Sequence, residues 1–304
     1  MRVAAIDCGT NSLRLLIADI DQGNFREIYR TMEVVRLGEG VDQNKTFKLE
    51  AIDRTLTALQ TFSREITRRG VERIRFCATS ATRDATNRDL FIKGVEEILG
   101  ITPEVIPGTE EASLSFRGAT KEFATAEGPF LVVDIGGGST EFVYGTANVI
   151  AARSVNVGCV RMAERHQLTS PLSESSRTAA IADIDAAIAE AAAEVPLTKA
   201  RSVIAVAGTA TTVAAAALGL ETYDRYAIHL ARISAEKAHE IAQSLAAMTR
   251  SEIAALGFMH PGRVDVITAG SLVLSRIMSA TGAKEFIASE SDILDGMAWS
   301  LAEK

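Results

Sequence analysis

An apolar run that ends in an aspartate and enters a glycine-containing loop occurs twice in this 304-residue chain. The first copy leads through Asp7 to Ser12, and the second leads through Asp134 and three glycines to Ser139, with an offset of 127 residues at both positions. A short apolar run is typical of a buried strand, and the glycines allow backbone N–H groups to approach an anion closely. The repeat therefore predicts a duplicated fold that holds one ligand between its halves.

Segments of strand and helix pattern alternate along both halves of the chain. We predict strands at 3–8, 13–20, 25–36, 73–78, 104–106, 130–135, 140–145, 148–156, 202–206 and 285–288. Helical periods predict helices at about 47–69, 87–99, 109–123, 160–167, 173–194, 234–246 and 263–281, with others after 208–212 and from 292. This alternation indicates the α/β class, as two related lobes with a cleft between them.

The segment Ala126-Glu-Gly-Pro129 is the clearest candidate for a boundary between the lobes. We therefore expect an N-terminal lobe at 1–126 and a C-terminal lobe at 127–304. The last helix, at about 292–304, could pack back onto the N-terminal lobe.

Composition excludes several classes of function. A net charge of −7 gives no general affinity for nucleic acid or for an anionic membrane. The three cysteines form no CxxC pair, so neither a zinc site nor a disulfide framework is indicated. There is no signal-peptide core, and the uncharged stretch 203–220 has the pattern of a strand, turn and helix. We expect a cytoplasmic protein without nucleic-acid or membrane partners, and a homodimer is left open.

The candidate chemistry consists of carboxylates beside glycine loops, because the sequence has no phosphate-binding G-x-x-x-x-G-K-[ST], no G-x-S-x-G and no H-E-x-x-H. Phosphoryl transfer requires cations on the phosphate oxygens and a group that orients the attacking nucleophile. Asp7 and Asp134 would face each other across the cleft and share a divalent metal, with Glu141 completing its ligands. The alternative is that these aspartates only cap turns, but the duplication favours a function.

Three further features have two interpretations each on the sequence alone. Glu111 opens a helix, where spacing alone favours a role that only complements the helix dipole. Arg83 could hold a phosphate or lie on the surface at a helix start. Gly208 and Thr209 could donate to a phosphate, or form a turn of small residues that lets a strand and a helix pack closely.

At these residues the chain resembles the exopolyphosphatase / guanosine pentaphosphate phosphohydrolase family. This family is a branch of the actin-like, sugar-kinase and heat-shock ATPase superfamily. The resemblance rests on five ordered motifs: Ile6-Asp-Cys-Gly-Thr-Asn-Ser12, Ala78-Thr-Ser-Ala-Thr-Arg-Asp84, Gly108-Thr-Glu-Glu-Ala112, Val133-Asp-Ile-Gly-Gly-Gly-Ser-Thr-Glu141 and Val206-Ala-Gly-Thr-Ala-Thr-Thr212.

The resemblance implies two ribonuclease-H-like lobes, a divalent cation (Mg²⁺ or Mn²⁺) and hydrolytic removal of a terminal phosphate. It implies that Glu111 is the catalytic carboxylate that activates water, which replaces the dipole interpretation. It assigns metal binding to Asp7, Asp134 and Glu141. It assigns phosphate binding to Asn11, Ser12, Arg83, Gly137, Gly138, Ser139, Gly208 and Thr209.

The expected function is that of an exopolyphosphatase acting on inorganic polyphosphate. Relatives with an additional helical domain are longer, so a preference for short polyphosphates is expected. The alternatives are a guanosine pentaphosphate 5′-phosphohydrolase, a sugar kinase or ATPase, and a non-catalytic polyphosphate or nucleotide sensor. Pro107 and Ser113 replace the family's frequent Ser and Arg, and the segment 290–296 lacks its usual Arg, so we assign no phosphate contact there.

Overall fold

The computed structural model describes residues 1–21 and 23–302, which form two compact units. The first unit is Met1–Gly118 with Ile293–Lys304, and the second is Ala119–Asp292. The division therefore falls before the boundary expected at residue 126, and the last helix belongs with the first unit. Within the described ranges, no helix combines the length and the apolar character needed to span a membrane.

The first unit contains a five-stranded sheet in the order β3-β2-β1-β4-β5. Strands β1, β2 and β3 pair antiparallel, whereas β4 and β5 continue the sheet in parallel with β1. The elements are β1 (Arg2–Cys8), β2 (Ser12–Asp21), β3 (Asn24–Val34), α1 (Val41–Asn44), α2 (Leu49–Arg68), β4 (Arg73–Ala78), α3 (Ser80–Asp84), α4 (Arg88–Leu99), β5 (Glu104–Val105), α5 (Gly108–Thr120) and α13 (Ile293–Ala302).

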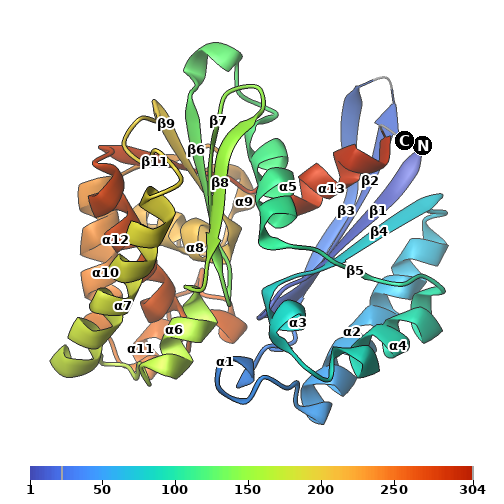
Figure 1. The fold of residues 1–304 in the computed structure, drawn as a ribbon, viewed down its shortest axis with the longest axis horizontal. Coiled ribbons are helices and arrows are strands. Elements are labelled where there is room, and N and C mark those ends of the chain that lie inside the picture. Colours follow the sequence, from blue (N-terminus) through green and yellow to red (C-terminus); the bar gives the residue numbers. More distant parts are fainter. Residues whose placement is uncertain (22, 303–304) are drawn as a thin grey trace. The chain divides into compact units, whose positions relative to one another are not determined.

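Strand β1 is buried on both faces, because successive side chains of a strand point to opposite sides of its sheet. Ala4 and Ile6 enter one core together with residues of α2 and α4. Val3 and Ala5 enter a second core together with residues of α13. Figure 1 shows α2 and α4 on one side of this sheet and α13 on the other. The uninterrupted apolar run before Asp7 is therefore explained by two layers of helix.

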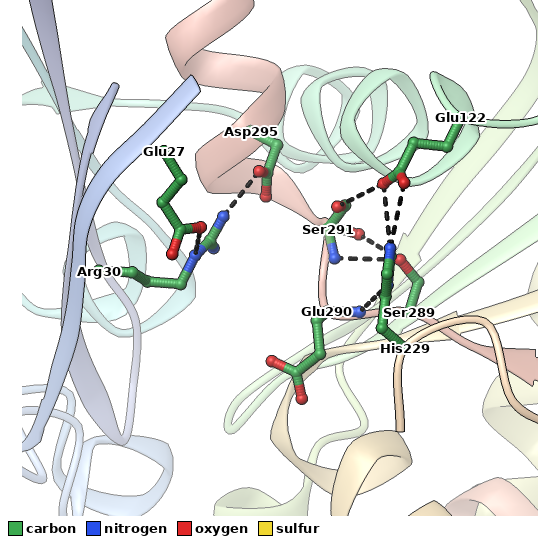
Figure 2. A network of polar contacts seen from close by, with 8 residues as sticks. All are labelled: Glu27, Arg30, Glu122, His229, Ser289, Glu290, Ser291 and Asp295. Atoms are coloured by element: carbon green, nitrogen blue, oxygen red, sulfur yellow. Dashed lines mark hydrogen bonds and ion pairs between the residues drawn. The ribbon is translucent and has the colours of Figure 1, made fainter. Parts of the chain in front are cut away.

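Helix α13 is held against its neighbours at two points. Gly296 lies so close to α5 that a Cβ atom there would collide with the backbone carbonyl oxygen of Leu114. Asp295 accepts a hydrogen bond of 2.7 Å from Arg30 on β3, and Glu27 accepts one of 2.8 Å from the same guanidinium (Figure 2). The last helix of the chain thus supports α5, the helix that carries Glu111.

We expect Gly296→Ala to lower the free energy of unfolding by about 1–3 kcal/mol, since the added methyl group must force α13 away from rigid backbone. Urea denaturation followed by circular dichroism measures this change. Gly100→Ala is the matched control, because Gly100 has φ 69° but open space around it. The control should show only the cost of a left-handed alanine, about 1–2 kcal/mol, and should leave the packing of α5 intact. An unchanged stability of Gly296→Ala would contradict the close contact.

The second unit contains a six-stranded sheet in the order β10-β11-β9-β6-β7-β8. Its first five strands from the β8 edge repeat the order and the directions found in the first unit, and β10 is added antiparallel to β11. The elements are β6 (Phe130–Ile135), β7 (Thr140–Gly145), β8 (Val149–Val155), α6 (Cys159–Arg165), α7 (Glu174–Ala192), β9 (Ser202–Val206), α8 (Ala207–Ala217), α9 (Arg225–Ile228), β10 (Arg232–Ser234), α10 (Ala235–Ala247), α11 (Arg250–Ala254), α12 (Ile267–Thr281) and β11 (Glu285–Ala288), with short 3-10 turns at Thr125–Glu127 and Pro261–Arg263.

The α/β class and the duplication of its strand order are confirmed. Every strand predicted from the sequence is present within a few residues of its expected bounds. The predicted helix at 263–281 begins later, at Ile267, because a separate 3-10 turn occupies Pro261–Arg263. The elements missed by the sequence are short: α1, α3, α9, α11 and β10 span three to five residues each. One helical turn is too short to display a period of 3.6 residues, so pattern alone could not find them.

Candidate active site

Three polar side chains of the first unit gather where its parallel strands end. Asp7 is paired with Cys77 near the ends of β1 and β4, and Arg83 lies in α3, directly after β4. Glu111 lies in the first turn of α5, which follows β5. In α/β sheets the loops after the carboxyl ends of parallel strands commonly form the ligand site. The fold thus brings together three residues that are up to 104 positions apart in the sequence.

Glu111 and Arg83 are in direct contact. The Nη1 atom of Arg83 donates to Oε2 of Glu111 at 2.7 Å and to the carbonyl oxygen of Ile106 at 2.9 Å. Only 9% of Glu111 is exposed, and burial raises the pKa of its carboxyl group. The Arg83 charge and the hydrogen bonds from Arg83 and Thr79 lower this pKa, while the nearby charge of Asp7 raises it, and the net shift is upward. A carboxylate with a raised pKa is a better proton acceptor than an ordinary surface glutamate.

Asp7 is held by an arginine of its own hairpin. Asp7 on β1 is directly opposite Arg14 on β2, and the guanidinium donates to Oδ2 of Asp7 from Nε at 2.9 Å and from Nη2 at 2.6 Å. Residues directly opposite in an antiparallel pair lie on the same face of the sheet. The first copy of the repeated motif therefore contains a permanent positive charge beside its carboxylate.

The two glycine loops have the same backbone closure. The N–H group of Gly9 donates to the carbonyl oxygen of Ser12 at 3.0 Å, and that of Gly136 donates to the carbonyl oxygen of Ser139 at 3.0 Å. Asn11, at the tip of the first loop, accepts at its backbone carbonyl from two N–H groups that follow β3. The repeat seen in the sequence is thus also a repeat of geometry, with two loops of one shape.

The second copy of the motif has a carboxylate where the first has arginine. Asp134 on β6 is directly opposite Glu141 on β7, and both are buried, with 6% and 0% of each residue exposed. Oε1 of Glu141 accepts from the hydroxyl group of Ser154 at 2.7 Å. Carboxylates directly opposite each other repel, and a divalent cation bound between them would offset that repulsion. Glu141 occupies the position equivalent to Arg14, at the same offset of 127 residues.

The glycines of the second loop are enclosed by α6 and the turn before it. Arg161 is buried and donates from Nε to the carbonyl oxygen of Gly138 at 2.5 Å. A Cβ atom at Gly158 would lie only 2.5 Å from the backbone of Gly137. The carbonyl oxygens of this loop are therefore bound by the protein, which fixes the loop backbone around Gly137 and Gly138.

Gly208 and Thr209 lie at the same edge of the second sheet, because β9 pairs in parallel with β6 and Val206 is the partner of Asp134. The guanidinium of Arg263 lies flat against Gly208, where a Cβ atom would be 2.6 Å from it. Arg263 also donates to the hydroxyl group of Thr212 at 3.1 Å, and that hydroxyl donates to the carbonyl oxygen of Gly208 at 2.6 Å. The turn thus combines small residues, hydroxyl groups and one arginine, a combination suited to a phosphate.

The described residues contain no group of three or more His, Cys, Asp or Glu side chains placed to hold a metal ion. Mg²⁺ is commonly held by only one or two carboxylates, with water and substrate phosphate supplying the other oxygen ligands. Asp134 and Glu141 fit that pattern as two buried carboxylates on paired strands. Asp7 is a less simple metal ligand, since its Oδ2 already accepts two hydrogen bonds from the Arg14 guanidinium. The sharing of one metal by Asp7 and Asp134 stays a prediction.

Three arginines at these two edges were missed by the sequence analysis: Arg14, Arg161 and Arg263. The duplication could have revealed Arg14, because its position corresponds to Glu141. Arg161 and Arg263 had no such signal, since each reaches its loop from a helix or turn distant in the sequence. The other candidate residues lie near the carboxyl ends of the parallel strands of their own unit.

The comparisons with known proteins establish the family of this chain. A model of the Ppx/GppA phosphatase family matches residues 16–304. The chain therefore belongs to the Ppx/GppA phosphatase family, as the sequence motifs predicted.

Several relatives show how much of the chain this family likeness covers. Exopolyphosphatase 2 of Mycobacterium tuberculosis is 45% identical, over 99% of this chain and 98% of that protein. A solved structure of an exopolyphosphatase-like protein superimposes with a TM-score of 0.95 at 43% identity, over 99% of this chain and 97% of that one. A guanosine-5′-triphosphate,3′-diphosphate pyrophosphatase of Pseudoalteromonas atlantica is 37% identical over 63% of this chain and 38% of its own length.

The contacts of Glu111 give a prediction about pH dependence. If Glu111 acts as a base, the acidic limb of kcat/KM against pH reports its pKa. Arg83→Met removes two influences that lower this pKa, so the acidic limb should move to higher pH, in addition to any loss of rate. Arg75→Met is the control, because Arg75 pairs with the neighbouring Glu110 instead. An acidic limb that stays in place in Arg83→Met would show that another group controls it.

Proposed function

We propose that this chain is an exopolyphosphatase, which hydrolyses the terminal phosphoanhydride bond of inorganic polyphosphate with the help of a divalent cation. The observation that carries the proposal is the buried contact between Glu111 and Arg83 at the edge of the first sheet. Membership of the Ppx/GppA phosphatase family and the likeness to Exopolyphosphatase 2 support it. A preference for short chains stays a prediction.

In this proposal Glu111 accepts a proton from the attacking water. The water oxygen forms a bond to the terminal phosphorus, the bond to the bridging oxygen breaks, and the shortened polyphosphate leaves with the bond's electron pair. Arg83, together with the backbone N–H groups of the two glycine loops, would hold the phosphate oxygens. The side chains of Ser12, Ser139 and Thr209 would add hydroxyl donors.

The position of Arg83 also supports a role in timing. Before substrate binds, the guanidinium donates to Glu111 and so lowers the pKa of that carboxyl group. When a phosphate draws Arg83 away, Glu111 loses this donor in a site that still desolvates it. Removal of a hydrogen bond to the charged form favours the neutral form, so the carboxylate becomes a stronger base. The base would thus reach full strength when the substrate is present.

A divalent cation, Mg²⁺ or Mn²⁺, would neutralise charge on the phosphate oxygens during the reaction. Asp134 and Glu141 would hold it. Ser154 donates to Glu141 at 2.7 Å and so orients one of the two carboxylates. Groups that hydrogen-bond to a metal ligand commonly change the affinity for the metal as well, so Ser154 belongs to the same proposed site.

Replacing Glu111 tests the proposed base directly. Phosphate release from short-chain polyphosphate with Mg²⁺ should fall by about 10²–10⁴-fold in Glu111→Gln. Glu110→Gln is the matched control, because Glu110 is the adjacent residue, 41% of its side chain is exposed and it pairs with Arg75. The control should keep nearly normal activity. Normal release by Glu111→Gln would mean that the base is another residue.

The proposed metal site can be tested by titration. In Asp134→Asn the Mg²⁺ concentration that gives half-maximal activity should rise by at least about tenfold, since one charged oxygen ligand is lost. Direct binding of Mn²⁺, followed by its paramagnetic signal, should weaken in parallel. The same titration on Asp7→Asn decides whether the carboxylate bound by Arg14 also takes part. An unchanged Mg²⁺ dependence in Asp134→Asn would remove Asp134 from the site.

Guanosine pentaphosphate is the second candidate substrate, favoured by the likeness to the Pseudoalteromonas atlantica pyrophosphatase. It would use the same catalytic residues. A comparison of kcat/KM for the two substrates separates these activities. Tight binding of polyphosphate without release of phosphate from either substrate would support the sensor interpretation instead.

A further inference from the structure

The three glycines of the second loop are held at their carbonyl oxygens by the start of α6. The backbone N–H group of Cys159 donates to the carbonyl oxygen of Gly136 at 3.0 Å. Two further backbone N–H groups of α6 donate to the carbonyl oxygen of Gly137, at 2.9 and 3.0 Å. The side chain of Arg161 completes the set, because its Nε donates to the carbonyl oxygen of Gly138 at 2.5 Å. Three consecutive carbonyl groups of the loop therefore point toward the start of one helix.

The direction of these carbonyl groups also determines where the N–H groups of the loop point. In a planar trans peptide, the C=O group of one residue and the N–H group of the next point in opposite directions. The N–H groups of Gly137, Gly138 and Ser139 therefore point away from α6. Within residues 1–21 and 23–302, none of these three N–H groups donates a hydrogen bond to the protein. Successive N–H groups of this kind form a concave site for an anion.

Gly158, directly before α6, allows the helix to approach the loop this closely. A Cβ atom at Gly158 would lie 2.5 Å from both the carbonyl carbon and the carbonyl oxygen of Gly137, and 2.7 Å from the nitrogen of Gly138. The backbone of Gly158 is extended, with φ −160°, so its conformation does not itself require glycine. Glycine is needed at this position because the rigid backbone of the loop occupies the place of a side chain.

The first loop is held in the same way by the segment that follows β3. The carbonyl oxygen of Thr10 accepts from the N–H group of Gly38 at 2.9 Å, and that of Asn11 accepts from two N–H groups directly after β3 at 2.9 and 3.0 Å. At the offset of 127 residues, Thr10 and Asn11 correspond to Gly137 and Gly138. A Cβ atom at Gly38 would lie 2.4 Å from Cγ2 of Thr10. Both halves of the duplication therefore bind the loop carbonyl groups from the segment after their third strand.

We propose that Gly158 and Arg161 are positioning residues for the loop 136–139. Gly158 admits the start of α6 to the loop, and Arg161 holds the Gly138 carbonyl oxygen so that the next N–H group faces the opposite side. Arg161 is only 6% exposed, so it acts through the loop. The inference rests on the proposed function, in which the N–H groups of this loop bind phosphate oxygens. These two residues then determine the affinity for substrate more than the rate of the chemical step.

Two substitutions of Arg161 separate its hydrogen bond from its charge. Arg161→Gln places an amide nitrogen at the position of Nε and keeps a donor for the Gly138 carbonyl oxygen, whereas Arg161→Met has a similar length and no donor. Both variants lose the charge and every other contact of the guanidinium. In Arg161→Met the KM for short-chain polyphosphate with Mg²⁺ should rise about five- to tenfold, with a smaller change in kcat, and in Arg161→Gln most of the affinity should return. An equal KM in the two variants would overturn the role of this hydrogen bond.

Arg165→Met is the matched control, because Arg165 lies on the same helix and donates to Asp183 on α7 at 2.9 Å. It removes a guanidinium from α6 without touching the bond to the Gly138 carbonyl oxygen, and it should leave KM unchanged. Thermal unfolding of this control and of Arg161→Met measures how much each substitution destabilises the fold. A rise of KM in Arg165→Met as large as in Arg161→Met would show that general loosening of α6 is the cause, and would overturn the inference.

A second test does not depend on catalysis. Inorganic phosphate, added to the substrate-free protein, should shift the amide NMR signals of Gly137, Gly138 and Ser139 in the wild type and in Arg161→Gln, and much less in Arg161→Met. A wild type that releases no phosphate from polyphosphate would overturn the proposed function, while these shifts would still decide the positioning role. Signals that do not move in the wild type, or that move equally in all three proteins, would overturn the inference.

Gly158→Ala tests the close approach of α6. The added methyl group must force the helix away from rigid backbone, so KM should rise at least about fivefold. Gly219→Ala is the control, because Gly219 has φ 66° and open space around it. It should lower the melting temperature through backbone strain and leave KM unchanged, which separates lost stability from lost positioning. A folded Gly158→Ala protein with the wild-type KM would overturn the role of Gly158.

Discussion

Parallel pairing between β1 and β4, and between β6 and β9, is the constraint on which both candidate sites depend. It places the ends of these strands at one edge of each sheet, so that the residues following them become neighbours without any local signal between them. In the first unit Asp7 and Arg83 lie at the ends of neighbouring strands for this reason, and in the second unit Asp134 and Gly208 do. The buried apolar runs of β1 and β6 therefore form the cores and also determine where Asp7 and Asp134, at the ends of these strands, are placed.

The duplication explains the common frame of the two hairpins, and one divergence between them changes their charge. Both hairpins place a polar residue directly opposite the strand-end aspartate: Arg14 in the first and Glu141 in the second. The first hairpin therefore has a cation of its own beside its carboxylate, whereas the second has two carboxylates on paired strands. The duplicated hairpins thus share one backbone frame but differ in charge.

The sequence predicted the fold and the residues at the ends of strands, because both follow from local patterns. Apolar runs, glycine stops and the repeat offset of 127 were sufficient to locate every strand except the three-residue β10, and both glycine loops. The role of Glu111 was different, since spacing favoured a helix-dipole role and only the family resemblance pointed to catalysis. The contact with Arg83 depends on the packing of α3 and α5, which no local pattern encodes. Arg263 was missed for the same reason.

The raised pKa of Glu111 shows which influence dominates at the first edge. A guanidinium at 2.7 Å would by itself lower the pKa of a carboxyl group, yet the net shift is upward because burial outweighs the attraction. Buried ion pairs often stabilise a fold less than apolar side chains of similar size. The pair is therefore poorly explained as a device for stability. The free-energy cost of burying this pair has an explanation if the pair serves catalysis. The fold would then keep the Glu111 carboxylate desolvated and basic, next to a cation, Arg83, that could bind a phosphate instead.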